Sequence, residues 1–284
     1  MTERYVIDND VPIKNKVLLV FDGHSYFHRA YNVVKNSNLI EKETIETTTS
    51  LFLDMIDRVV DRCAPDEFII IFDTNRETLL KKLIYKDYKA NRATPSEFQK
   101  QCERSIMDNL LQLEYPYYSI EGYEADQIIS GICYLAQDKN IVTVIATKDK
   151  DLYELLKYAD VLIYDKHEYY SKEDAIKKFE VLPEQIGDYL SLVGDTSDNI
   201  PGIPGVGKVT AAKLIEQFGT LEKILEEGPS LKGKLGEKIA AGKDSARISM
   251  RLVSLYDDLE LDLKPAKIDF SLIKEDLMIY GINL

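Results

Sequence analysis

The chain has 284 residues, of which 45% are hydrophobic, and it carries a formal net charge of −13 at pH 7. This length leaves room for about two domains with ordinary hydrophobic cores. The acidic balance argues against nucleic-acid binding through overall charge, so such binding would need local basic segments. No apolar run approaches the ~18 residues of a membrane-spanning helix, and the polar tail at 1–15 does not resemble a signal peptide.

Cysteine usage indicates the compartment. The three cysteines, Cys63, Cys102 and Cys133, form no C-x-x-C pair. An odd number without metal-binding spacing argues against a disulfide framework or a zinc knuckle and favours a reducing compartment. We therefore expect a cytoplasmic protein without a membrane association.

Three short, continuous apolar runs follow the tail, at 17–21, 68–72 and 141–146, with helical patterns between them. Runs of this kind are typical of parallel strands buried on both faces, so the sequence predicts an α/β fold with a mainly parallel central sheet flanked by helices. Functional sites of such sheets lie at the carboxyl ends of the strands. Each run is followed there by an aspartate: Asp22, Asp73 and Asp149.

Further acidic residues accumulate around this predicted edge. A single aspartate after a strand is most often a helix N-cap, but the group here is larger than capping requires. Glu124 and Asp126 begin an amphipathic helical segment, whose dipole favours carboxylates in its first turn. Crowded carboxylates raise each other's pKa unless cations neutralise them, and hard divalent ions prefer oxygen ligands. We therefore predict two metal ions held by eight acids: Asp22, Asp73, Glu124, Asp126, Asp149, Asp151, Asp195 and Asp198.

A basic segment at 76–92 lies between the second and third strands, with six basic and two acidic residues, and its helical pattern continues to about Leu113. A basic run is often only a solvated helix face. Tyr88, Lys89 and Arg92, however, combine an aromatic ring with cations, which suits base stacking and phosphate neutralisation.

The loop at 194–208 combines the Asp195–Asp198 pair with glycines that precede a helical segment at 208–218. Glycines at a helix start let backbone N–H groups approach a phosphate, which the helix dipole also favours. The segment has one apolar face, formed by Val209, Ala212, Leu214 and Ile215. A metal site beside a phosphate cradle indicates work on a phosphodiester.

Two other interpretations of local motifs are weaker. Gly202, Gly207 and Lys208 partly match a nucleotide-binding P-loop, but Val209 stands where that motif needs a hydroxyl, and no buried strand precedes it. His24 and His28 are spaced as zinc ligands on a helix can be, yet the surrounding carboxylates favour harder metals. No arrangement of a nucleophile with a base stands out.

Six motifs occur in order along about residues 16–260. They are Phe21-Asp22-Gly23 with Arg29-Ala30-Tyr31, Ile71-Phe72-Asp73, Asp87-Tyr88-Lys89-Ala90-Asn91-Arg92, Glu121-Gly122-Tyr123-Glu124-Ala125-Asp126, Thr147-Lys148-Asp149-Lys150-Asp151 and the stretch 194–213. In these motifs the chain resembles the 5′–3′ exonuclease domain of bacterial DNA polymerase I and its free-standing bacteriophage relatives, the prokaryotic flap endonucleases.

The resemblance implies a PIN-like nuclease core at 16–183 with a helical arch at about 76–113. A helix–three-turn–helix DNA-binding region would follow at 184–263, and 264–284 would be a C-terminal tail. Ser171–Phe179 has a capped helical pattern, 184–257 reads as mostly helical, and 259–263 is predicted as a short strand.

The implied activity is that of a metal-dependent, structure-specific 5′ nuclease, a 5′–3′ exonuclease and flap endonuclease used in replication or primer removal. Its substrates would be 5′ flaps and nicked or gapped DNA duplexes, with RNA–DNA hybrids as a further substrate, and the enzyme would be a monomer. The implied cofactors are two Mg²⁺ or Mn²⁺ ions at the eight acids and K⁺ at the loop before the helix at 208–218.

The resemblance also assigns roles to single residues. Lys89 and Arg92 correspond to the family's active-site lysine and arginine on the arch, and Tyr88 to its base-stacking tyrosine. The helix–three-turn–helix element places DNA contacts at Gly205, Gly207, Lys208, Thr210 and Lys213.

Two positions depart from the family pattern. Gln127 stands where an acid is common, although a glutamine can still orient a metal-bound water. Lys148 stands where glycine is common and adds a cation beside the carboxylates. Two alternatives remain: a DNA-junction-binding protein with a weakened catalytic site, which predicts lost carboxylates, and a toxin-type ribonuclease, which is usually shorter and lacks the 194–213 element.

Overall fold

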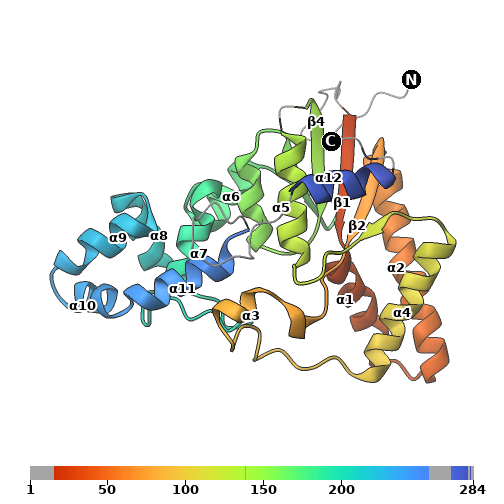
Figure 1. The fold of residues 1–284 in the computed structure, drawn as a ribbon, viewed down its shortest axis with the longest axis horizontal. Coiled ribbons are helices and arrows are strands. Elements are labelled where there is room, and N and C mark those ends of the chain that lie inside the picture. The colour runs from red at the N-terminus through yellow and green to blue at the C-terminus, as the bar shows by residue number, and fades with distance from the viewer. Residues whose placement is uncertain (1–15, 138, 256–269, 281, 283–284) are drawn as a thin grey trace.

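The computed structural model describes residues 16–137, 139–255, 270–280 and 282. The polar tail predicted at 1–15 and the strand predicted at 259–263 lie outside the described residues. Figure 1 shows an α/β body at one side and a helical lobe at the other.

A six-stranded sheet forms the centre of the body, in the order β3-β2-β1-β4-β5-β6. All neighbouring pairs are parallel except β5 with β6. The three apolar runs form strands, as the sequence predicted, and these strands, β2, β1 and β4, lie next to one another. The strands are β1 (Lys16–Asp22), β2 (Glu67–Ile71), β3 (Tyr117–Tyr118), β4 (Ile141–Ala146), β5 (Val161–Asp165) and β6 (Glu168–Tyr170).

Hydrophobic cores lie on both faces of this sheet. Alternate residues of β1 point to opposite faces, so Val17, Leu19 and Phe21 join one core while Leu18 and Val20 join the other. This is why the strand is apolar at every position. The first core is covered by α1 (Gly23–Val34), α2 (Glu41–Cys63) and α4 (Glu97–Gln112). The second is covered by α5 (Ala125–Ala136), the 3₁₀ helix η2 (Asp151–Lys157) and α6 (Lys172–Phe179).

The basic segment is less regular than predicted. It forms the short helices η1 (Arg76–Thr78) and α3 (Lys81–Ile84), and no helix covers 85–96. Pro95 disfavours helical backbone at the residue before it, and Lys89 has a φ of +57°, outside the helical region. Ser96 then caps α4 by accepting a hydrogen bond from the Gln99 N–H at 3.1 Å. The continuous helical pattern expected as far as Leu113 is therefore wrong between these helices.

The second part of the chain is helical, as predicted. Its elements are the 3₁₀ helix η3 (Pro183–Gln185), α7 (Ile186–Val193), α8 (Lys208–Phe218), α9 (Leu221–Glu227), the 3₁₀ helix η4 (Gly228–Ser230), α10 (Lys234–Ala241) and α11 (Lys243–Val253). A last helix, α12 (Phe270–Ile279), returns to the body and lies beside α5 (Figure 1). The sequence did not predict α12.

The predicted apolar face of α8 is correct in three of its four residues. Ala212, Leu214 and Ile215 are buried, but Val209 is 64% exposed. Ala211 occupies the inward position instead, and the helical period then carries Val209 to the outer side.

All three cysteines are buried and free of disulfides. Among the described helices, none combines the length and the apolar character needed to cross a membrane.

A tight hairpin links α7 to the loop before α8. Asp195 and Ile200 form an antiparallel bridge, with N–O distances of 2.7 and 2.9 Å. Gly202 follows with a φ of +61°, and its N–H donates to Ser249 Oγ at 2.9 Å. A Cβ at Gly202 would lie 2.5 Å from the backbone nitrogen of Gly194. This position therefore requires glycine.

Replacing Gly202 with alanine should lower the free energy of unfolding by about 1–3 kcal/mol, because it adds backbone strain and overpacking. Gly207 provides a matched control, since its φ is −97° and nothing lies within 4 Å of an added Cβ. Alanine there should change the free energy of unfolding by less than ~0.5 kcal/mol. Urea unfolding followed by circular dichroism measures both variants, and equal stabilities would contradict the close packing at Gly202.

Candidate active site

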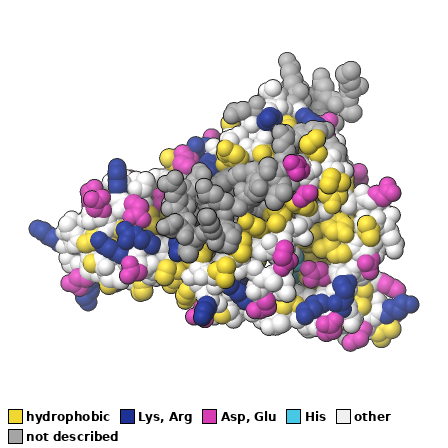
Figure 2. Space-filling model, viewed as in Figure 1, with side chains coloured by type: hydrophobic (Ala, Val, Ile, Leu, Met, Phe, Trp, Pro, Cys, Tyr) yellow, Lys and Arg dark blue, Asp and Glu magenta, His cyan; other side chains and the backbone are white. Residues whose placement is uncertain are grey.

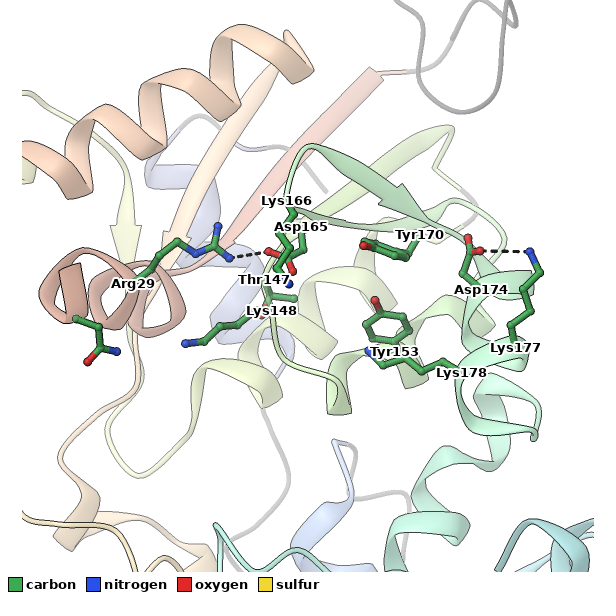
Figure 3. A pocket seen from close by; sticks show the side chains of 11 residues that line it. Arg29, Thr147, Lys148, Tyr153, Asp165, Lys166, Tyr170, Asp174, Lys177 and Lys178 are labelled. Carbon is green, nitrogen blue, oxygen red and sulfur yellow. Dashed lines mark hydrogen bonds and ion pairs between the residues drawn. The ribbon is translucent and has the colours of Figure 1, made fainter. Parts of the chain in front are cut away.

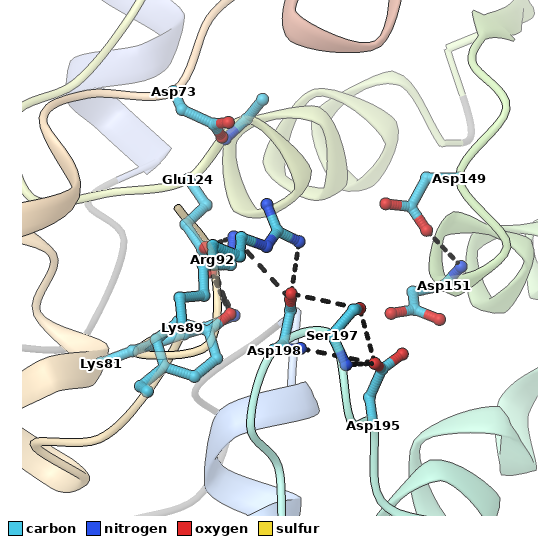
Figure 4. Close-up of polar contacts among 12 residues, drawn as sticks. Asp73, Lys81, Lys89, Arg92, Glu124, Asp149, Asp151, Asp195, Ser197 and Asp198 are labelled. Atoms are coloured by element: carbon cyan, nitrogen blue, oxygen red, sulfur yellow. Dashed lines mark hydrogen bonds and ion pairs between the residues drawn. The ribbon is translucent and has the colours of Figure 1, made fainter. Parts of the chain in front are cut away.

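The carboxyl edge of the sheet and the hairpin bring the predicted acids into one electrostatic group. Figure 4 labels Asp73, Glu124, Asp149, Asp151, Asp195 and Asp198. Burial, together with the charges of Asp73 and Asp149, raises the pKa of Asp22 to about 6. Burial likewise holds the pKa of Asp126 well above its ordinary value, together with the charges of Glu124 and Asp149. Together with Asp151, these interactions connect the charges of all eight acids.

Asp151 connects the sheet edge to the loop of the helical part. Burial, followed by the charge of Asp149, raises the pKa of Asp151 to about 7, and Asp195 and Asp198 act in the same direction. Carboxylates from the body and from the hairpin therefore repel one another across a shared space. Such repulsion is relieved by protonation or by bound cations.

Local hydrogen bonds fix the carboxylates on the sheet edge. Asp22 caps α1 by accepting from the Ser25 N–H at 2.9 Å, and it also accepts from Thr147 Oγ1 at 2.7 Å. Asp73 accepts from the N–H of Ala125, the first residue of α5, at 2.7 Å. The N-cap interpretation is thus correct for Asp22, which nonetheless also interacts with the charges of Asp73 and Asp149.

Glu124 is held by three side chains of the basic segment. It is 1% exposed and contacts Lys81 Nζ at 2.8 Å and also Lys89 Nζ. The Tyr88 hydroxyl donates to Glu124 Oε2 at 2.9 Å. Burial alone would raise the pKa of Glu124, but the charges of Lys81 and Lys89 hold it well below its ordinary value.

The hairpin acids are paired as well. Lys150 Nζ contacts Asp195 Oδ2 at 2.8 Å, and Arg92 bonds Asp198. Backbone contacts reinforce these pairs, since the Lys89 N–H donates to the Asp198 carbonyl at 2.8 Å. The basic segment and the hairpin are therefore joined directly, as Figure 4 shows.

The donor set suits a divalent cation, although it is not preassembled. Among the described residues, no three acidic, histidine or cysteine side chains form a group that could hold an ion as they stand. The carboxylates of Glu124, Asp195 and Asp198 instead form ion pairs with lysine and arginine side chains. One oxygen of Asp151 is nevertheless buried without a hydrogen-bond partner. An unsatisfied buried carboxylate oxygen among repelling acids is a fitting ligand for a hard cation.

Three further residues of the sequence analysis make contacts within the protein. The ring of Tyr88 is 2% exposed, so it is covered where base stacking was predicted. Gln127 accepts from the Glu124 N–H at 3.2 Å and so caps α5. His24 Nδ1 accepts from the Asp73 N–H at 3.0 Å, which is a packing role.

Sequence reasoning missed the residues that neutralise the acids. Lys81 and Lys150 stand among many lysines and have no distinctive spacing. Lys150 lies between two of the predicted ligands, which was the one available signal. Lys81 could not have been identified without knowing that α3 packs beside Glu124.

The predicted DNA-contact residues gather at the start of α8. Lys208 and Lys213 are exposed, and Gly207 is open to solvent. The carbonyl of Gly205 accepts from Lys238 Nζ at 3.0 Å, so a side-chain cation already contacts the loop where K⁺ was expected. Thr210 is half-buried. Figure 2 shows lysine and arginine side chains distributed over this helical lobe among acidic ones.

A sheet edge with buried carboxylates therefore lies beside a lysine and an arginine of the basic segment. Residues 17–180 match the family model described as 5′-3′ exonuclease, N-terminal resolvase-like domain. Residues 181–276 match the model described as 5′-3′ exonuclease, C-terminal SAM fold. The chain therefore belongs to the 5′–3′ exonuclease family.

Curated relatives include both free-standing and larger proteins. The 5′-3′ exonuclease of Aquifex aeolicus is 32% identical over 271 residues, which cover 92% of this chain and 91% of that protein. DNA polymerase I of Caldicellulosiruptor bescii is 35% identical over 256 residues. That match covers 87% of this chain but 30% of the polymerase.

Solved structures agree on the fold. The zinc-bound 5′-exonuclease of bacteriophage T5 has a TM-score of 0.73 at 22% identity, and the match covers 84% of this chain and 90% of that one. A complex of the bacteriophage T5 flap endonuclease with DNA and metal ions also has a TM-score of 0.73, at 20% identity, covering 94% and 100%.

Lys81 should contribute more to stability than its neighbour Lys82, which pairs with the exposed Glu77 at 3.0 Å. Lys81→Met leaves Glu124 with one buried cation fewer and should lower the free energy of unfolding by about 3 kcal/mol. Lys82→Met should cost less than ~1 kcal/mol. Urea unfolding in EDTA at neutral pH measures both, and equal losses would contradict a stabilising role for the Lys81–Glu124 pair.

The wild type and Lys81→Met should differ in their free energy of unfolding by an amount that depends on pH, because the pKa of Glu124 is lowered. A carboxylate with a lower pKa in the folded state stabilises the fold fully above its ordinary pKa of 4.5. Its contribution is lost as the pH falls below that value. The gap between the wild type and Lys81→Met should therefore be largest at neutral pH and shrink in acid.

Proposed function

We propose that this protein is a metal-dependent 5′ nuclease that hydrolyses DNA phosphodiesters near junctions between single strand and duplex. It acts as a 5′–3′ exonuclease and flap endonuclease. The observation that carries the proposal is the convergence of eight carboxylates beneath Lys89 and Arg92. Membership of the 5′–3′ exonuclease family supports it, and so does the DNA complex of the bacteriophage T5 relative.

The eight acids would hold two Mg²⁺ or Mn²⁺ ions. Such ions supply Lewis-acid activation of water and neutralise charge on the leaving oxygen. Lys89 and Arg92 stand beside the same carboxylates and would stabilise negative charge on the scissile phosphate. Until a phosphate arrives, they neutralise Glu124 and Asp198.

The basic segment has to rearrange for this role. Tyr88, Lys89 and Arg92 all bond acids of the proposed metal site, so ligand exchange at Glu124 and Asp198 would release them together. Release would also uncover the Tyr88 ring for stacking on a base. The basic segment would then serve as an arch over the bound strand.

The hairpin and α8 would hold the duplex. Gly207 leaves room for a phosphate to approach the backbone at the start of α8. Lys208 and Lys213 are exposed on the same helix, with Thr210 between them, and would contact the DNA backbone. Contacts of this kind carry no base sequence, which agrees with recognition of structure rather than sequence.

The alternative of a weakened junction-binding protein predicts missing carboxylates. All eight acids are present at the sheet edge and hairpin. The one departure, Gln127, caps α5. Catalysis is therefore the better-supported function, and the distinction can be tested directly.

Asp149→Asn should abolish Mg²⁺-dependent cleavage of a labelled 5′-flap duplex, because it removes a carboxylate at the centre of the acidic group. Folding and binding to the flap duplex should be retained, since the amide is isosteric. Asp108→Asn is the matched control, because Asp108 is exposed on α4 away from the acids. Gel-based cleavage with added Mg²⁺ or EDTA measures the activity. Wild-type turnover by the Asp149 variant would remove this residue from the site.

Lys208→Ala should weaken binding to every duplex-bearing substrate and flatten its salt dependence by about one phosphate's worth of counterions. Lys139→Ala is the control, because Lys139 is exposed before β4 at the opposite edge of the sheet. Fluorescence anisotropy at several salt concentrations measures the slope. The rejected P-loop interpretation predicts the opposite result. Lys208→Ala would then abolish ATP binding, as measured by calorimetry, and leave the affinity for the duplex unchanged.

A further inference from the structure

A second cavity lies beside the carboxylates, distinct from the one lined by Lys89 and Arg92. Its volume is about 890 Å³. Figure 3 shows its walls, which come from α1, the loop after β4, the β5–β6 turn and α6. Neither the proposed chemistry nor the proposed duplex contacts use it.

The cavity is strongly basic. Its lining includes five cations: Arg29, Lys148, Lys166, Lys177 and Lys178. The lining contains two acids, and each is already paired: Arg29 contacts Asp165 at 2.6 Å, and Lys177 contacts Asp174 at 3.6 Å.

Three lysines therefore remain without an acidic partner. Within the described part of the chain, no carboxylate lies within 4.0 Å of the ammonium groups of Lys148, Lys166 or Lys178. These three unpaired cations gather in one cavity of a chain whose net charge is −13. Their mutual repulsion would be relieved by an anion in the cavity.

One wall of the cavity is aromatic. Lys178 Nζ lies 3.6 Å from the centre of the Tyr153 ring, and burial lowers the pKa of Lys178. The rings of Tyr153 and Tyr170 are 5.9 Å apart at an angle of 52°. Cations beside aromatic rings suit a ligand that carries both phosphate and a base.

The cavity is connected to the carboxylates through Thr147, which lines it. Thr147 Oγ1 donates to Asp22 at 2.7 Å and accepts from the Asp149 N–H at 2.9 Å. A ligand in the cavity is thus one side chain away from the proposed metal ligands. Lys148, the residue that departs from the family's glycine, is the next residue along.

We propose that this cavity binds a phosphate group of single-stranded DNA that extends from the carboxylates. Lys148, Lys166 and Lys178 contact the phosphate, and Tyr153 and Tyr170 contact the sugar or base beside it. The inference rests on the proposed nuclease function and adds a subsite to it. The phosphate is either an internal diester or a terminal 5′-monoester, and both present the same anionic oxygens.

The test measures binding in EDTA, so that no cleavage occurs. The probes are a duplex with a 5′ oligothymidine tail, with and without a 5′-phosphate, and the same duplex without a tail. Lys178→Gln keeps the methylene contact with Tyr153 and removes the charge. Lys166→Asn removes the charge in a turn where Lys166 has a φ of +50°, which asparagine tolerates. Lys139→Gln controls for the change in net charge, and Lys178→Arg should restore binding.

We expect Lys178→Gln and Lys166→Asn each to weaken binding of the tailed duplex about tenfold, as for the loss of one charge-assisted contact. Binding of the untailed duplex should not change. A loss confined to the 5′-phosphorylated tail assigns the monoester, and a loss with both tails assigns the diester.

Two results would overturn the proposal: unchanged affinity of both variants for every tail, or an equal loss on the untailed duplex. If the wild type cleaves flaps with Mg²⁺ while the variants bind normally, the subsite is wrong and the nuclease function stands. If the wild type neither cleaves nor binds, the proposed function itself is wrong. Thermal unfolding of each variant shows whether the fold is intact.

Discussion

The repulsion among carboxylates at one edge of a parallel sheet governs the arrangement of this protein. Adjacent parallel strands end side by side, so Asp22, Asp73 and Asp149 cannot be kept apart. Buried acids of like charge are stable only when protonated or neutralised. Here the chain supplies its own cations, with Lys81 and Lys89 on Glu124, Arg92 on Asp198 and Lys150 on Asp195.

This neutralisation connects stability with chemistry. A buried ion pair gains little over an apolar pair of similar shape, but removing one partner leaves an expensive charge. The basic segment is consequently fixed in place by ion pairs with the same acids that would bind metal. Exchange of these cations for the proposed metal ions would keep the charge balanced and would free the lysine and arginine. The acidic group would then be a structural anchor in one state and a ligand set in the other.

The sequence predicted those features that depend on local periodicity. Continuous apolar runs identified β1, β2 and β4, and parallel topology then placed their trailing aspartates together. The acids of the hairpin were predicted as ligands because their spacing is distinctive. The error in the predicted face of α8 depended on tertiary packing, because Val209 points outward where Ala211 takes its place. The covered ring of Tyr88 also depends on tertiary contacts, because its hydroxyl reaches Glu124. The neutralising role of Lys81 is invisible locally, since its partner is far along the chain.

The ties between the basic segment and the hairpin have a consequence for synthesis on the ribosome. Asn199 Nδ2 donates to the Asp87 carbonyl at 2.6 Å, and Asn91 Nδ2 donates to the Thr196 carbonyl at 3.0 Å. These contacts join residues more than a hundred positions apart. Nascent chains fold from the N-terminus, so the sheet and its acids emerge well before the hairpin. The cover over the acids is completed only after the helical part has been translated, and a product truncated before the hairpin carries the acids without their finished cover.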